Sequence, residues 1–338
     1  MNRLVPAAGF LLLSITVVAL LGFAIPQAQQ HPQVMIAGLQ VSPGVIGSMT
    51  VIGLLLGAAT EMVFEAQRLT DVPLSEVICR HHGYNVLAVV GGALLTLLLS
   101  ADVGLGAVTA SALVGVIAAL VVPDYAVPAY CGSFVGMTSI QLLFSYEELA
   151  IAAVIAAIIY VLSACTFPGI GGKLGTIAFA GTMTTAWILG RPFVATSMPD
   201  MRTAMLIIGY AVMAAVLTFW VNVKLGHGAV MASAAVGLIG GLVLPQVYPE
   251  IGGTLAVVVF CASFAGMSSG ERFPRGVMMW IVGLVTGLIF VYSIPLGGGA
   301  GGKLGTIAFS ASLAVRGFYD LARRRIARLS RSEEAGRL

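Results

Sequence analysis

Charge is scarce in this sequence. Charged residues make up 9% of the 338 residues, whereas 59% are hydrophobic. An ordinary soluble domain carries roughly 25% charged residues, so a water-soluble globule of this size is excluded. The 17 Lys and Arg exceed the 14 Asp and Glu by only three, which excludes a nucleic-acid partner bound to a broad basic face. The composition instead predicts an all-α polytopic integral membrane protein whose main surroundings are the lipid bilayer.

Metal-site, disulfide and catalytic patterns are also missing. The four cysteines, Cys79, Cys131, Cys165 and Cys261, show no CxxC or Cys/His spacing, so we expect buried thiols. The four histidines form no HExxH motif, and the sequence has no nucleophile elbow. We therefore expect no metal, no cofactor and no enzymatic activity.

Long apolar runs are what the sequence has in abundance. A helix that crosses the hydrocarbon layer needs about 20 largely apolar residues, and the runs lack the alternation of barrel strands. Dividing the chain at its charges, prolines and glycine clusters gives about twelve candidate spans, some of them short enough to be broken or re-entrant. They are residues 5–25, 43–61, 85–101, 105–122, 128–143, 149–165, 173–189, 204–223, 227–244, 252–268, 276–294 and 303–317.

The first apolar run also has features of a signal peptide. Its length exceeds the usual apolar region of such a peptide, and Pro26 stands where a small residue is wanted before a cleavage point at Ala28. We expect an uncleaved first span, although the sequence leaves cleavage of residues 1–28 open.

The distribution of Lys and Arg sets the expected orientation. Positively charged short loops stay in the cytoplasm. With Arg3 inside, twelve crossings return the carboxyl terminus to the same side, together with Arg323, Arg324, Arg325, Arg328, Arg331 and Arg337. Arg68, Arg80, Lys224, Arg272 and Arg275 also fall inside, whereas Arg191 and Arg202 fall outside. We expect a multi-pass protein of the cytoplasmic membrane with both termini in the cytoplasm.

Internal repetition is the strongest signal in the sequence. Residues 106–123 match 228–245 at 12 of 18 positions, and GGKLGTIAF at 171–179 recurs unchanged at 301–309. Between these blocks, CGSFVGMTS at 131–139 corresponds to CASFAGMSS at 261–269. Three blocks in the same order indicate a duplicated unit.

The repetition suggests five segments along the chain. They are a two-helix leader with a cytoplasmic loop at 1–83, a first five-helix repeat at 84–190, a linker at 191–203, a second repeat at 204–320 and a basic tail at 321–338. An odd number of helices per repeat makes the second copy enter the membrane from the opposite side. Inverted repeats are typical of many secondary transporters, which bind their solute near the midplane where the copies meet. If one helix per repeat is re-entrant, the repeats are parallel instead.

The duplicated Gly-Gly-Lys motif is the main candidate site. Lys173 and Lys303 begin corresponding spans, each directly after a glycine cluster. A lysine at membrane depth suggests function unless it snorkels to the headgroups. A helix that starts there also points unpaired N–H groups and its positive dipole end at an anion. The expected solute-binding residues in this motif are Lys173, Lys303, Gly171, Gly172, Gly301, Gly302, Thr176 and Thr306.

The CGSFVGMTS and CASFAGMSS segments provide the second candidate motif. Their hydroxyl groups can bind a polar solute or a neighbouring backbone, and Phe134 and Phe264 can form a constriction or simply pack. The residues expected to line the path are Ser133, Ser263, Thr138 and Ser268.

Two other chemistries are disfavoured. A phosphate-binding loop needs Ser or Thr after Lys303, where Leu304 stands. Glu61 lies at the edge of its predicted span and no carboxylate lies inside any predicted span, which argues against an Asp/Glu proton relay.

These patterns predict a transporter or channel for a small polar or anionic solute. The sequence does not separate channel from carrier, identify a coupling ion or decide whether several copies assemble. Two rivals stay open. One is a non-transporting scaffold or assembly subunit of a larger complex, and the other is an intramembrane enzyme that acts on a lipid-linked substrate.

Overall fold

The computed structural model describes residues 4–29, 34–36, 39–41, 43–71 and 82–335. These residues are almost entirely helical, apart from one short antiparallel hairpin. The elements are α1 Leu4–Gln29, β1 Val34–Ile36, β2 Leu39–Val41, α2 Pro43–Asp71, α3 His82–Leu97, η2 Leu98–Asp102, α4 Ala107–Val121, η3 Pro123–Tyr125, α5 Ala126–Gly136, α6 Tyr146–Leu162, α7 Lys173–Ile188, α8 Met201–Phe219, η4 Trp220–Lys224, α9 Ala229–Val247, α10 Gly252–Gly266, α11 Met278–Ser293 and α12 Lys303–Ala335.

The structure confirms a membrane-embedded helical protein but not twelve crossings. Five helices are long and apolar enough to span a bilayer: Leu4–Ala28, Gly47–Thr70, Gly83–Asp102, Met201–Lys224 and Ala229–Val247. Three shorter apolar helices are α4, α10 and α11. Each predicted span overlaps one α-helix of the described residues, so the apolar pattern located the helices better than it counted the crossings.

Three predicted boundaries were wrong. Helix α2 runs ten residues past the predicted end at Glu61, and α12 runs well past residue 317 because its charged half continues the helix. Helix α5 ends at Gly136, whereas the predicted span reached residue 143. A helix can continue past the end of its apolar run: Glu61 and Glu65 of α2 are buried and paired with Arg272, whereas residues 321–327 of α12 are exposed.

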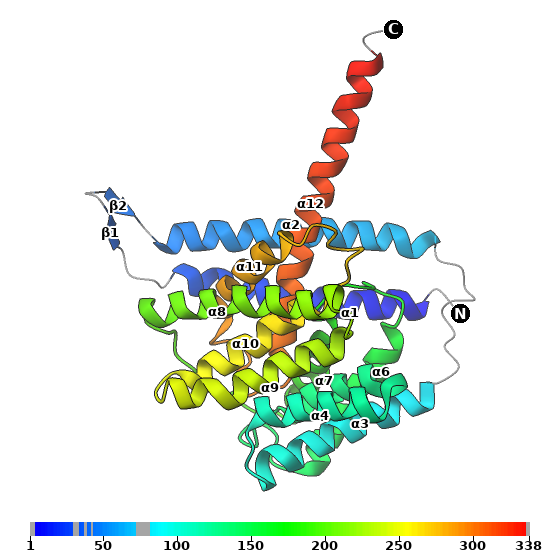
Figure 1. The fold of residues 1–338 in the computed structure, drawn as a ribbon, viewed down its shortest axis with the longest axis vertical. Helices are drawn as coiled ribbons and strands as arrows, with labels where there is room; N and C mark the ends of the chain where they lie inside the picture. The colour runs from blue at the N-terminus through cyan, green and yellow to red at the C-terminus, as the bar shows by residue number, and fades with distance from the viewer. Residues whose placement is uncertain (1–3, 30–33, 37–38, 42, 72–81, 336–338) are drawn as a thin grey trace.

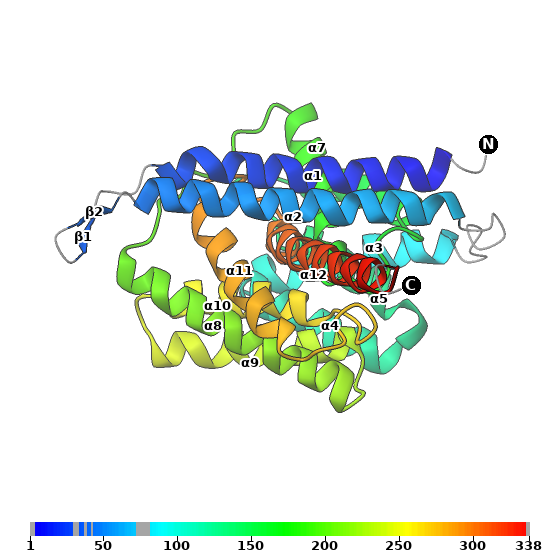
Figure 2. The ribbon, with the colours of Figure 1, turned by 90° about the horizontal axis from the view of Figure 1, so that it is seen from above.

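The long helices α1 and α2 lie side by side, and α12 crosses α2 steeply before its carboxyl half projects from the body (Figures 1 and 2). At that crossing, a methyl group added at Gly317 would collide with the backbone of Gly57. Outward faces carry apolar side chains, such as Leu11, Ile15 and Leu56, which are 55%, 63% and 62% exposed. Such faces suit a lipid surface.

Small residues allow the helices to pack at short range. On α3, a Cβ at Gly92 would collide with the carbonyl oxygen of Ala129 on α5, whereas Gly91 has open space around it. Close backbone contact of this kind increases the packing between helices that have no hydrophobic effect to drive them together in lipid.

The two adjacent glycines make a matched test of this packing. Gly92→Ala is expected to destabilise the protein by about 1–3 kcal/mol, because the added methyl group overpacks the α3–α5 contact. Gly91→Ala is expected to be neutral or slightly stabilising, because alanine favours the helix. Thermal unfolding of the purified variants in detergent measures both, and equal midpoints would contradict this account of the contact.

Candidate functional site

The candidate site starts at two glycine-rich loops, which precede α7 and α12. Gly172 and Gly302 stand immediately before the two helices with φ of +86° and +83°, a conformation that favours glycine. The chain therefore turns sharply and starts each helix at a lysine, Lys173 in α7 and Lys303 in α12. The identical sequences give identical local turns.

Each loop binds a helix end of the other half of the chain. The Gly171 N–H donates to Ser268 Oγ (3.0 Å) beyond α10, and the Gly301 N–H donates to Thr138 Oγ1 (3.2 Å) beyond α5. A second pair of bonds joins backbones: Ser269 N–H to Gly169 O (2.9 Å) and Ser139 N–H to Gly299 O (2.8 Å). The predicted residues Thr138 and Ser268 thus hold the glycine loops.

The two lysine-bearing helices meet directly behind these loops. A Cβ at Gly175 would lie 2.5 Å from Gly305 Cα, so α7 and α12 cross with glycine against glycine. Methyl groups at Gly171 and Gly301 would collide with the carbonyl oxygens of Phe264 and Phe134, respectively. Methyl groups at Gly172 and Gly302 would likewise collide with the backbone nitrogens of Phe309 and Phe179, so the four predicted glycines are all required for close backbone contact.

Both ammonium groups bind backbone carbonyls. Lys173 Nζ donates to Thr166 O (2.6 Å) and more weakly to Ala164 O (3.4 Å), and Lys303 Nζ donates to Ile294 O (2.7 Å). These carbonyls follow α6 and α11, where the negative dipole end of each helix favours a cation. Among the described residues, no carboxylate oxygen lies within 4.0 Å of either ammonium group.

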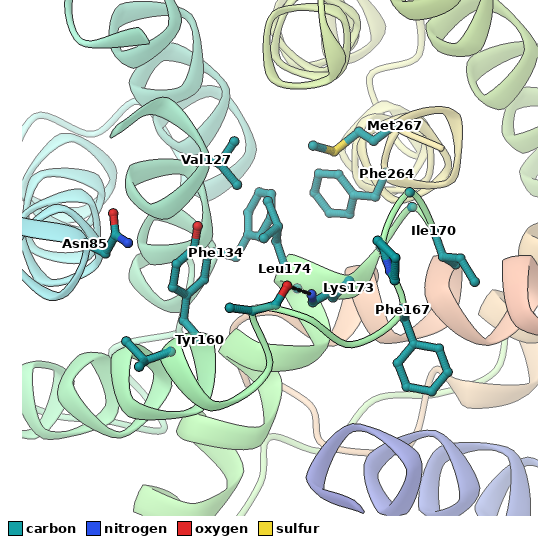
Figure 3. A pocket seen from close by; sticks show the side chains of 17 residues that line it. Asn85, Val127, Phe134, Tyr160, Phe167, Ile170, Lys173, Leu174, Phe264 and Met267 are labelled. Atoms are coloured by element: carbon teal, nitrogen blue, oxygen red, sulfur yellow. Dashed lines mark hydrogen bonds between the residues drawn. The ribbon is translucent and has the colours of Figure 1, made fainter. Parts of the chain in front are cut away.

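Each lysine lines a cavity. The cavity at Lys173 has a volume of about 320 Å³ and the cavity at Lys303 about 690 Å³. They share no lining residue, yet many of their residues correspond at the 130-residue offset. In each one, a methionine from the other half of the chain is present, Met267 in the first cavity and Met137 in the second. Figure 3 shows Lys173 inside its cavity, with Phe264 and Met267 on the α10 side.

Four aromatic rings pack together between α5 and α10. They are Tyr130, Phe134, Phe260 and Phe264, all at most 1% exposed. Phe134 and Phe264 have ring centroids 4.5 Å apart and form part of the wall of the Lys173 cavity. The predicted phenylalanine pair is therefore brought together at the centre of the molecule.

Ser133 and Ser263 each form a hydrogen bond with a serine of a neighbouring helix. Ser133 Oγ lies 2.8 Å from Ser111 Oγ, and Ser263 Oγ lies 2.8 Å from Ser233 Oγ. Ser133, Ser263, Thr138 and Ser268 line neither of the two cavities. A role for them in contact with a solute stays a prediction, and in this conformation their hydroxyl groups hold the helices and loops.

The predicted threonines of α7 and α12 differ. Thr176 Oγ1 donates to Gly172 O (3.3 Å), whereas Thr306 Oγ1 has no hydrogen-bond partner. Both side chains are fully buried. Neither lines the two cavities.

A buried charge network beside the first loop was missed by the sequence reasoning. Glu61 and Glu65 lie well inside α2, each 1% exposed, one helical turn apart. Arg272 donates to both, at 3.0 Å and 3.2 Å, and its Nε donates to Pro168 O (2.9 Å). The expectation that no carboxylate lies inside a span was therefore wrong. The i, i+4 carboxylates within an otherwise apolar helix were the signal that could have revealed it.

The two loops are held by different means. Glu65 Oε1 accepts the Phe167 N–H (2.6 Å), so charged groups of α2 hold the first loop. The second loop is held by the linker, because the Val194 N–H donates to Gly298 O (2.9 Å) and Thr196 Oγ1 donates to Ile294 O (2.8 Å). Segment 191–203, which the sequence predicts to be a linker, thus packs over the second loop.

No protein-family model, curated protein or solved structure matches the chain. Inferences about function therefore depend on the site itself.

The cross-bonds from Thr138 and Ser268 to the loops can be tested by removing the acceptors. Thr138→Val and Ser268→Ala should each destabilise the protein by about 1–3 kcal/mol, because a buried glycine N–H loses its acceptor. Thr138→Ser and Ser268→Thr retain the hydroxyl and should lose less. Thermal unfolding measures the difference, and valine and serine variants of equal stability at position 138 would refute the assignment.

Proposed function

We propose that this protein transports a small polar or anionic solute across a membrane. The observation that carries the proposal is a pair of cavities, each containing one ammonium group and one glycine-rich helix start. A positive charge beside the positive dipole end of a helix favours an anion. Because no described carboxylate pairs with either ammonium, its charge is available to a ligand.

The aromatic cluster is the proposed barrier along the path. Phe264 approaches the first loop through its carbonyl oxygen, which faces Gly171, and Phe134 approaches the second loop in the same way at Gly301. A movement of either loop therefore acts on the backbone that carries a phenylalanine. This linkage supports a carrier in which each cavity opens in turn.

The proposed architecture has twelve helices, with two repeats of inverted topology that meet at α7 and α12. Corresponding contacts at corresponding residues support two equivalent halves, such as the serine pairs and the loop bonds described above. We place the protein in the cytoplasmic membrane with both termini inside, following the charge bias. Assembly of several copies is compatible with this architecture.

Loss of the two charges provides the test of anion binding. Lys173→Gln and Lys303→Gln, alone and together, are compared with the wild type in thermal unfolding with phosphate, sulfate, chloride, acetate and succinate. At least one of these anions should raise the wild-type midpoint, since a ligand at about 100 times its Kd stabilises by roughly 2.7 kcal/mol. The double variant should lose that shift.

Lys224→Gln is the matched control, because Lys224 is exposed at the end of η4 and lines neither cavity. A shift that survives in the double lysine variant would move the site elsewhere. Variants that change only stability, with no anion shift in the wild type, would favour a scaffold or assembly subunit. Turnover of a lipid-linked substrate by the purified protein would favour an enzyme.

The barrier can be tested in proteoliposomes. The Phe134→Ala, Phe264→Ala double variant should raise the passive leak of chloride by tenfold or more, because the cavity wall loses two buried rings. Phe193→Ala, at a linker residue that is 39% exposed, should leave the leak unchanged. A chloride-sensitive dye inside the vesicles measures the rate of chloride leak. A double variant that leaks no faster than the wild type would exclude these rings as the barrier.

A further inference from the structure

Glu61 carries an unusual oxygen atom. Its Oε1 accepts from Arg272, whereas its Oε2 is buried and has no hydrogen-bond partner. A buried carboxylate oxygen without a donor loses its hydrogen bonds to water and gains none from the protein. Keeping such a group charged therefore costs free energy. By contrast, both oxygens of the neighbouring Glu65 accept hydrogen bonds.

The charges around Glu61 come from three elements. Glu65 and Arg68 belong to α2 itself, Arg272 to the segment between α10 and α11, and Arg316 and Asp320 to α12. Lys173 at the start of α7 is within electrostatic reach of Glu65. Three carboxylates thus face three guanidinium groups and one ammonium group. This balance leaves no surplus negative charge for a metal ion, and no cluster of three metal-ligating groups occurs in the described residues.

We propose that Glu61 binds a proton at Oε2, and that this proton loosens the loop that forms part of the wall of the Lys173 cavity. A proton is the cation that fits, because a single oxygen atom binds it and it brings no coordination shell into the arginine cluster. Once Glu61 is neutral, Arg272 keeps only Glu65 as its charged partner and holds α2 less tightly.

The link from Glu61 to the cavity runs through Arg272. Its Nε donates to Pro168 O (2.9 Å), Arg316 donates to its carbonyl oxygen, and it lies three residues beyond Ser269, whose N–H donates to Gly169 O (2.9 Å). Pro168 and Gly169 are part of the cavity wall. Loss of charge at Glu61 therefore weakens the support of the loop. Among the described residues, no carboxylate or guanidinium group is bonded to the second loop, so the proton acts on one cavity only.

The binding of a proton to Glu61 does not depend on the proposed transport function. Only a role of that proton in driving transport rests on it. The experiment therefore uses no solute. Hydrogen exchange of peptides covering residues 163–173 is measured in detergent at about pH 5 and about pH 8. Variants are compared with the wild type at the same pH, so the intrinsic pH dependence of exchange cancels.

Glu61→Gln imitates the protonated state. At about pH 8 this segment should exchange roughly fivefold to tenfold faster in the variant than in the wild type, because a charge-assisted bond to Arg272 is weakened. At about pH 5 the two should exchange at equal rates, since the wild type is then protonated. Glu271→Gln is the control, since Glu271 is exposed beside Arg272 and should match the wild type at both pH values.

The outcomes separate a proton site from a merely structural one. Equal exchange of Glu61→Gln and the wild type at both pH values overturns the proposal. Faster exchange by the same factor at both values also overturns it, because the residue then only supports the loop. Glu61→Asp, which can still bind a proton, should keep the pH dependence.

A second measurement uses the wild type alone, so it does not depend on whether any variant folds. Infrared difference spectra of the wild type between the two pH values should contain the band of a buried protonated carboxyl group, and its absence overturns the proposal. If these tests fail while the lysine-dependent anion shift is present, only the proton site is lost. If the anion shift is absent while the tests succeed, the proton site stands and the proposed function fails.

Discussion

Close contact between glycine backbones is the constraint on which the centre of this protein depends. At the crossing of α7 and α12, Gly175 faces Gly305, and any larger residue would separate the helices. The two loops that precede these helices then reach across to the opposite half, where Ser268 and Thr138 accept their N–H groups. The cavities, the lysines and the aromatic rings take their positions from this contact.

The apolar pattern located the helices because burial in lipid acts on local composition. It misplaced the end of α2 because Glu61 is neutralised by Arg272, which is 211 residues away in the sequence. The residues near Glu61 in the sequence do not indicate that a partner this far along the chain will lie beside it. The end of α12 was misplaced for another reason, because its exposed basic half continues the helix after the apolar run ends near residue 317.

The lysine motif was found from sequence because it is identical in two places, and the structure adds what each lysine contacts. Lys303 donates to the carbonyl oxygen of Ile294, nine residues earlier, which is a local interaction that spacing suggests. The contact of each glycine loop with the other half of the chain was not predictable. Because the two motifs are so similar, the sequence does not show whether the Gly171 loop binds Thr138 or Ser268. For Ser133, residue type indicated a polar contact, but only the fold identifies Ser111 as its partner.

The unequal support of the two glycine loops has a consequence for their response to acidity. Charged side chains of α2 hold the first loop, whereas uncharged linker groups such as Val194 N–H hold the second. Under the proposal for Glu61, acidity changes the support of the first loop and not that of the second, whereas salt has little effect because Glu61 and Glu65 are buried. Under the proposed transport function, the two cavities would therefore respond to different conditions, although the glycine and lysine residues at each one are the same.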